Sequence, residues 1–171
     1  MKYLFFLILI LVFAACRETI KPTPPITEAQ LQEPLIRVNK RLMQKESAEI
    51  NSYIVRNKLT MKQSGTGLRY FINEEGSGSY AGSGMHATVK YTVALLDGTP
   101  CYSSDSTGPR TFTVDQDQIE SGLHEGIKLM RKGDKAKFIL PSHLAFGLVG
   151  DDDKIPGRSA VVYTIELTEL N

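Results

Sequence analysis

Apolar residues alternate with polar ones in several separate stretches of this chain, and this alternation restricts the fold more than any other feature. The longest such stretch places apolar side chains at every second position: Ala87, Val89, Tyr91, Val93 and Leu95. Shorter stretches of the same kind cover residues 68–72, 136–140 and 161–167. A period of two puts all these apolar side chains on one face of a strand, so each stretch predicts a half-buried β-strand.

One segment between the predicted strands has the helical period instead. Its apolar residues recur at three- and four-residue spacing and are Ile119, Leu123, Ile127 and Met130. Asp117 and Glu120 suit a helix start, and Gly133 suits a stop. Phe112 and Val114 add a further short strand before this segment. One helix among several antiparallel strands predicts an α+β domain in which the helix covers the apolar face of the sheet.

The first residues have the form of an export signal. Lys2 precedes an apolar run over residues 3–15, which is shorter than the roughly 20 residues that span a bilayer. The run ends in Phe-Ala-Ala-Cys, which resembles a bacterial lipobox with Cys16 as the lipidated residue. We therefore expect a lipoprotein signal peptide over residues 1–15 and a membrane anchor on Cys16. The alternative is an ordinary cleaved signal with an incidental cysteine.

Two segments precede the predicted domain. Residues 16–33 are proline-rich and offer little to bury, which indicates an extended tether. Residues 34–60 repeat apolar positions with helical spacing and predict a helical appendage, either one helix or two short helices that break near residues 45–47. The appendage could pack on its own domain or pair two protomers. We expect a monomer rather than a dimer.

Composition and residue spacing exclude several kinds of function. A formal net charge of +1 does not favour binding to nucleic acid, which requires a strongly basic face. The histidines His86, His124 and His143 are scattered without ligand spacing, and three adjacent aspartates at 151–153 do not have the spacing of a calcium loop. Cys101 has no partner for an internal disulfide once Cys16 is modified. We expect neither a metal nor a cofactor.

Five motifs carry a family resemblance, and they follow one another in order. They read V-K-Y-T-V-A-L-L-D-G-T over 89–99, G-P-R-T-F-T-V over 108–114, S-G-L-H-E-G-I-K-L-M-R-K-G-D-K-A over 121–136, P-S-H-L-A-F-G over 141–147 and I-P-G-R-S-A-V-V-Y-T-I-E-L over 155–167. The set resembles the FKBP family of peptidyl-prolyl cis/trans isomerases. The layout of signal, lipobox, short helices and single domain also resembles, more loosely, FKBP-like lipoproteins associated with gliding motility.

The resemblance implies a fold and a function for residues 61–171. The fold is a curved antiparallel sheet wrapped around one short α-helix. The function is isomerisation of X-Pro bonds in exported proteins, with proline-containing polypeptides as partners and without metal, cofactor or covalent chemistry. The site of action would be the cell envelope, on a lipid-anchored protein that faces the periplasm from the inner or the outer membrane. The alternative is an FKBP-like chaperone or binding module of an envelope complex with weak or no catalysis.

The resemblance also implies a substrate pocket. Its apolar lining would be Tyr91, Phe112, Ile119, Leu123, Phe146, Ile155 and Tyr163, and the backbone N–H of Glu120 would bind a ligand carbonyl. The remaining pocket pair, Cys101 and Tyr102, stands where the family has Phe-Asp. Arg110 and Lys154 also replace less polar residues. These departures predict a pocket of altered shape and reduced activity.

Overall fold

The computed structural model describes residues 28–171. The predicted signal peptide, Cys16 and the first part of the tether lie outside the described residues. The described residues fall into two units, which divide between Val38 and Asn39. Among the described helices, none combines the length and the apolar character that crossing a membrane requires.

Helix α2 (Glu28–Arg56) runs without a break through residues 45–47 and contains Pro34. In the first unit its side chains Leu35, Ile36 and Val38 are exposed. In the second unit the same helix packs on the domain, because Ile50 is 1% exposed and joins an apolar cluster with Ile139, Ala160 and Val162. Of the two packing modes that the sequence left open, contact with its own domain therefore holds for the second half of the helix.

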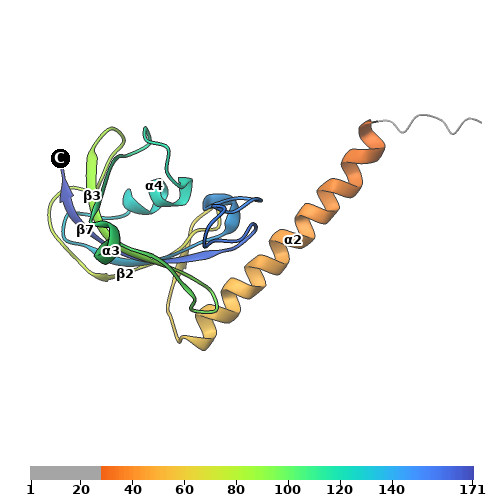
Figure 1. Cartoon of the computed structure of the whole chain (residues 1–171), viewed down its shortest axis with the longest axis horizontal. Coiled ribbons are helices and arrows are strands. Elements are labelled where there is room, and N and C mark those ends of the chain that lie inside the picture. The colour runs from red at the N-terminus through yellow and green to blue at the C-terminus, as the bar shows by residue number, and fades with distance from the viewer. Residues whose placement is uncertain (1–27) are drawn as a thin grey trace, which may run out of the picture. The chain divides into compact units, whose positions relative to one another are not determined.

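The domain is built on a seven-stranded antiparallel sheet, which confirms the predicted α+β class (Figure 1). The strand order is β1-β2-β6-β7-β3-β4, and β5 pairs with β3. The strands are β1 (Lys62–Gln63), β2 (Arg69–Glu74), β3 (His86–Leu95), β4 (Pro100–Ser103), β5 (Arg110–Thr113), β6 (Lys135–Leu140) and β7 (Val161–Leu170). The short helices are α3 (Ser104–Thr107), α4 (Ser121–Ile127) and the 3-10 turn η1 (Ser142–Leu144).

The two central strands are buried on both faces. Phe138 and Leu140 of β6 belong to the main core with α4, whereas Ile139 between them belongs to the cluster that includes α2. Successive residues of a strand point to opposite faces, so the sheet separates the two clusters. The predicted alternation holds. On the face away from the main core, α2 covers Ile139 and Val162, whereas Thr164 is exposed.

Helix α4 lies close against the sheet in the hollow of its curve (Figure 1). The helix is shorter than the predicted apolar stripe, because it ends at Ile127 and Met130 follows in a turn. Its buried glycines allow the close approach. A Cβ on Gly122 would lie 2.7 Å from Cγ of Leu140, and one on Gly126 would lie 2.6 Å from Cε2 of Phe138.

The replacement Gly122→Ala tests this packing. We expect it to lower the free energy of unfolding by about 1–3 kcal/mol, because overfilling a dense core forces neighbours from their positions. Urea denaturation measures the change. Gly65→Ala is the control, since a Cβ there meets nothing within 4 Å. Equal stability of the two variants would contradict the packing argument.

Candidate functional site

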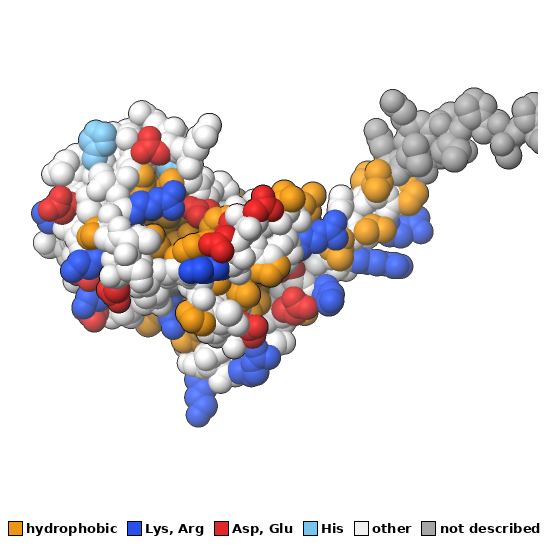
Figure 2. All heavy atoms as spheres, in the orientation of Figure 1, with side chains coloured by type: hydrophobic (Ala, Val, Ile, Leu, Met, Phe, Trp, Pro, Cys, Tyr) orange, Lys and Arg blue, Asp and Glu red, His pale blue; other side chains and the backbone are white. Residues whose placement is uncertain are grey.

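The ten predicted pocket residues come from seven parts of the domain, and nearly all of them lie in or against its main apolar core. Nine of them belong to one apolar cluster or pack against it: Tyr91, Cys101, Tyr102, Phe112, Ile119, Leu123, Phe146, Ile155 and Tyr163. The tenth, Glu120, lies immediately before α4 and bonds to Tyr163. In Figure 2 hydrophobic side chains gather in a hollow of this domain, with basic and acidic side chains beside them.

Two tyrosines form the centre of this group. The ring centroids of Tyr91 and Tyr163 are 6.3 Å apart and the rings are tilted by 39°. The Tyr91 backbone N–H donates to Oγ of Ser104 at 3.0 Å, and its hydroxyl lies 3.3 Å from Oγ1 of Thr107. The α3 turn therefore fixes Tyr91 from both ends, while Tyr163 is only 2% exposed.

Glu120 places a carboxylate inside this apolar group. Its side chain is 8% exposed, and its Oε1 accepts a hydrogen bond from the Tyr163 hydroxyl at 3.0 Å. Burial and the charge of Glu120 raise the pKa of Tyr163 well above its ordinary value, so the phenol keeps its proton. The sequence analysis assigned only the backbone of Glu120. The sequence held one signal for a role of the side chain. Tyr163 stands where the family usually has Phe, and its additional hydroxyl requires a partner such as the Glu120 carboxylate.

The backbone N–H of Glu120 is also free of protein partners. Among the described residues no acceptor takes a hydrogen bond from it, although its carbonyl accepts from Leu123 at 2.9 Å. Unpaired N–H groups in a partly buried position are uncommon, and a ligand carbonyl is one way to satisfy them. The geometry is therefore compatible with the carbonyl-binding role that the family resemblance implies.

Tyr102 does not bond to Tyr91. Its hydroxyl donates to the carboxylate of Asp151 and lies 3.3 Å from Oδ2 of Asp153. Oδ1 of Asp151 accepts from the N–H of Ile155 at 2.7 Å, so this contact holds the loop that carries Ile155. The ammonium group of Lys154 lies 5.1 Å above the Tyr102 ring. The sequence indicated only that Tyr102 removes a carboxylate from the pocket. In the structure Tyr102 also holds the loop that carries Ile155.

Cys101 is buried, and its surroundings do not favour the reactive thiolate form. The side chain is 4% exposed, and its sulfur lies 3.7 Å and 3.9 Å from the carbonyl oxygens of Thr99 and Lys154. Burial, with the nearby charge of Asp151, raises the pKa of this thiol. The thiolate is the nucleophilic form, so Cys101 serves here as a small apolar wall.

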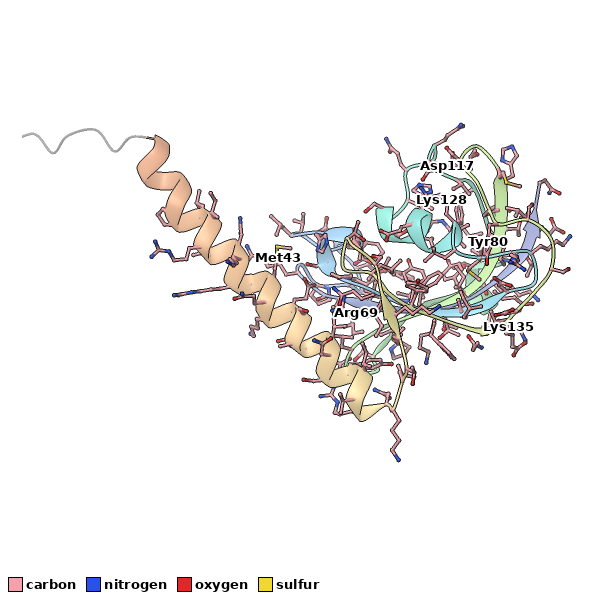
Figure 3. All side chains as sticks on the ribbon, turned by 180° about the vertical axis from the view of Figure 1, so that it is seen from behind. Met43, Arg69, Tyr80, Asp117, Lys128 and Lys135 are labelled. Atoms are coloured by element: carbon pink, nitrogen blue, oxygen red, sulfur yellow. The ribbon has the colours of Figure 1, made fainter. Side chains whose placement is uncertain are left out.

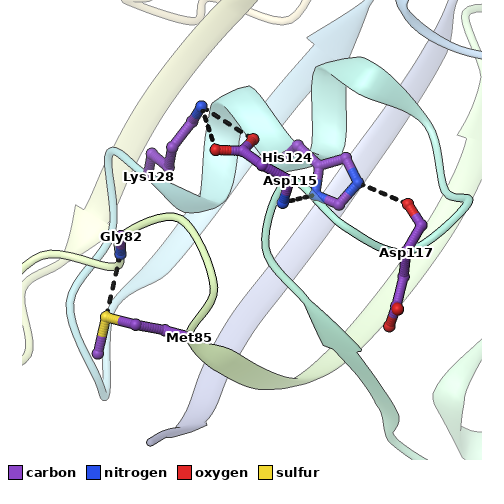
Figure 4. Close-up of polar contacts among 6 residues, drawn as sticks. All are labelled: Gly82, Met85, Asp115, Asp117, His124 and Lys128. Atoms are coloured by element: carbon purple, nitrogen blue, oxygen red, sulfur yellow. Dashed lines mark hydrogen bonds and ion pairs between the residues drawn. The ribbon is translucent and has the colours of Figure 1, made fainter.

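His124 fixes the segment between β5 and α4, a role that the sequence did not reveal (Figure 4). Its Nδ1 accepts from the N–H of Asp115 at 2.9 Å, and its Nε2 lies 3.0 Å from the carbonyl oxygen of Asp117. The ring also meets Phe112 edge-on at 5.8 Å. Lys128 holds the same segment through Asp115 at 2.9 Å. His124 is thereby committed to the backbone, and no group of residues suited to a metal occurs in the described part of the chain.

Two cavities lie away from this group of residues. A groove of about 610 Å³ is lined by residues of β1, β2 and the end of α4, among them Phe71, Tyr80 and Lys128. Figure 3 shows Tyr80 and Lys128 on the side of the domain where α4 ends. A second cavity of about 240 Å³ lies between α2 and the turn before β2, beside Arg69. Neither includes any of the ten predicted pocket residues, so cavity volume alone would have pointed elsewhere.

Comparison with known proteins agrees with the motifs. The family model described as FKBP-type peptidyl-prolyl cis-trans isomerase matches residues 78–168. The chain is 34% identical over 111 residues to the probable isomerase FkpA of Neisseria meningitidis serogroup B. That match covers 64% of this chain but 40% of the relative's length. The outer membrane protein MIP of Legionella longbeachae is 32% identical over 159 residues, which cover 85% of this chain and 67% of the relative.

Solved structures give the same result for the fold. The crystal structure of FkpA from Escherichia coli superposes with a TM-score of 0.65 at 26% identity, over 94% of this chain and 81% of that one. The crystal structure of AtFKBP13 gives a TM-score of 0.61 at 27% identity, over 66% of this chain and 99% of that one. The likeness to AtFKBP13 thus extends over nearly all of the shorter protein.

The contact between Tyr102 and Asp151 predicts a pH effect. Burial opposes ionisation of Asp151, but the hydrogen bonds from Tyr102 and from backbone N–H groups lower its pKa below the ordinary value. A depressed carboxyl pKa stabilises the fold above about pH 4, and this contribution is lost as the pH falls through the folded pKa.

Tyr102→Phe should therefore unfold at a lower temperature than wild type at pH 7, and the difference should shrink as the pH falls from about 4 to 2. Thermal unfolding at several pH values measures it. Tyr80→Phe is the matched control, because its hydroxyl contacts Arg131 and no carboxylate. A difference from wild type that does not change with pH would contradict the assignment.

Proposed function

This chain belongs to the FKBP-type peptidyl-prolyl cis-trans isomerase family, and we propose that its domain accelerates rotation about X-Pro bonds in exported polypeptides. The observation that carries the proposal is the N–H of Glu120, which has no partner among the described residues and belongs to a residue that hydrogen-bonds to Tyr163 in the apolar core. The chain spans about two fifths of the length of some curated relatives, so the activity is proposed for this chain and not transferred from those proteins.

The chemistry requires no nucleophile or cofactor. Rotation about an amide has a barrier of about 18–20 kcal/mol that comes from resonance, which the twisted transition state loses. The twisted amide is less polar than the planar one, so an apolar wall that excludes water favours it. Lowering the barrier by about 4 kcal/mol accelerates rotation roughly a thousandfold.

The residues divide this work between two kinds of contact. Phe112, Ile155 and Tyr163 would supply the apolar wall. Each is at most 3% exposed, so little water has to leave these side chains when a substrate binds. The N–H of Glu120 would bind a substrate carbonyl and fix the segment while the X-Pro bond turns. A proline-containing segment of a polypeptide is the partner that such a site fits.

We also propose that the protein acts in the cell envelope, held to a membrane by lipid on Cys16. The motif Phe-Ala-Ala-Cys after a short apolar run supports the anchor. One relative is named an outer membrane protein, which supports the compartment. The half of α2 that packs on its own domain favours a monomer, since those apolar side chains are already covered.

A non-catalytic binding module is the second candidate, and the altered pair Cys101 and Tyr102 favours it. The family resemblance implies a pocket-lining Phe and a ligand-binding Asp at these two positions, and this chain has neither. An assay of turnover separates the two candidates, since a binding module would take up prolyl peptides without accelerating their isomerisation.

Tyr91→Ala tests the isomerase proposal. We expect wild-type protein, purified in detergent, to accelerate cis/trans exchange of an X-Pro peptide, and the variant to lose about tenfold in kcat/KM, which corresponds to about 1.4 kcal/mol of barrier. Tyr80→Ala is the matched control, because this exposed tyrosine lines the separate 610 Å³ groove. Binding of prolyl peptides without any acceleration by wild type would favour the binding module.

Cys16→Ser tests the anchor. Because stable attachment requires buried acyl chains at about 0.8 kcal/mol per CH2, loss of the lipidation site should release the protein from membranes. Fractionation of cells, followed by mass measurement of the mature N-terminus, checks this outcome. A variant that remains as membrane-bound as wild type would show that the protein is held in another way.

A further inference from the structure

Glu120 carries a second unused group besides its N–H. Its Oε1 accepts from Tyr163, but Oε2 is buried and accepts no hydrogen bond from any described residue. The residue lies directly before α4, yet its carboxylate does not cap that helix. Short polar side chains at such a position accept from first-turn N–H groups, whereas the longer Glu120 side chain extends to Tyr163.

A buried carboxylate oxygen that accepts no hydrogen bond is unfavourable, because an ion pair at 3.6 Å replaces only part of the hydration that it has lost. Native proteins retain few such atoms, and each calls for a physical explanation. The fold itself does not need Oε2, since Oε1 already satisfies the Tyr163 hydroxyl. A ligand that donates a hydrogen bond would supply the missing partner.

Arg110 covers this oxygen. Its Nη1 lies 3.6 Å from Oε2, which is near enough for attraction but longer than a hydrogen bond. The Arg110 side chain is 38% exposed. Its guanidinium makes no hydrogen bond to a side chain or backbone group in the described part of the chain, so little holds it in place. Because the Arg110 side of the pair is exposed, the guanidinium can turn toward solvent and open Oε2 to a bound donor while its charge stays nearby.

We propose that Oε2 of Glu120 accepts a hydrogen bond from an uncharged donor on a residue next to the substrate proline, and that Arg110 is its movable cover. Glu120 then offers a donor and an acceptor on one residue. Its N–H takes a carbonyl of the substrate backbone, and its Oε2 takes a hydroxyl or amide of a neighbouring side chain. The inference rests on the proposed isomerase function and adds the preferred substrate class.

The expected donor is uncharged because Arg110 remains nearby. The carboxylate and the guanidinium neutralise one another at 3.6 Å, and a lysine or arginine of the substrate would meet the Arg110 charge at close range. A threonine or serine hydroxyl carries the donor without the charge. The site should therefore prefer Thr over its near-isostere Val, and should not prefer Lys.

Exchange NMR on short peptides measures this preference without a coupling protease. One series varies the residue before proline among Thr, Val and Lys, and a second varies the residue after it. Full-length wild-type protein should accelerate the Thr peptide more than the Val peptide by at least about fivefold in one of the series, and should show no preference for Lys. Equal rates for Thr and Val in both series would overturn the inference.

Matched variants identify the atom that is responsible. Tyr163→Phe keeps Glu120 and should retain the preference for Thr. The double variant Glu120→Leu with Tyr163→Phe leaves no unpaired hydroxyl behind, and its rates for Thr and Val should become equal. Glu169→Gln is the control for loss of a carboxylate, because Glu169 is exposed on β7. Loss of the preference in Tyr163→Phe, or its persistence in the double variant, would contradict the assignment to Glu120.

Arg110→Gln gives a change of opposite sign, which a merely structural role would not produce. Without the guanidinium, the Glu120 charge is no longer neutralised, so Lys peptides should gain at least about fivefold relative to wild type. Lys90→Gln, an exposed cation of β3, should leave all ratios unchanged. Unchanged Lys rates in Arg110→Gln would show that Arg110 does not cover the oxygen.

If wild type turns over none of the peptides, the same comparison is made on their dissociation constants. A preference for Thr in binding alone would uphold the acceptor role while the isomerase proposal fails. Absence of both turnover and binding for every prolyl peptide would overturn the two together.

Discussion

The close approach of α4 to β6 fixes the position of almost everything in the candidate site. Gly122 and Gly126 let the helix backbone lie directly on Leu140 and Phe138, where any larger residue would stand off. That contact determines where Glu120 can project from the helix start. A helix held farther out would move its carboxylate away from the Tyr163 hydroxyl, which is now 3.0 Å distant.

Polar contacts within the site follow from replacements that occur together. The residue at 102 lacks the carboxylate that the family resemblance would place there, yet a carboxylate enters the same apolar group from Glu120. Tyr102 in turn uses its hydroxyl to hold the loop of Asp151 and Ile155. Each change looks damaging alone. In the structure, the hydroxyls of Tyr102 and Tyr163 both have carboxylate partners, whereas Oε2 and the N–H of Glu120 accept or donate no hydrogen bond among the described residues.

The sequence predicted the strands and failed on the contacts between distant residues, and the reason is physical. The period of two is a local property that survives whatever the rest of the chain does. The bond between Tyr102 and Asp151 joins positions 49 residues apart, and nothing local marks it. His124 looked like a scattered histidine because its partners are backbone groups, which every sequence contains.

The ends of helices were harder to place for a related reason. The apolar stripe from Ile119 to Met130 predicted one helix, but α4 keeps only the part that can lie flat on the sheet. The shortening has a consequence for the site, since it leaves Glu120 outside the helix with its N–H unpaired. Had the helix begun a turn earlier with Asp117 as its N-cap, Glu120 would have been the third helical residue, and its N–H would have been a target for the capping Asp117 carboxylate. A substrate carbonyl would then have competed with that cap for the donor.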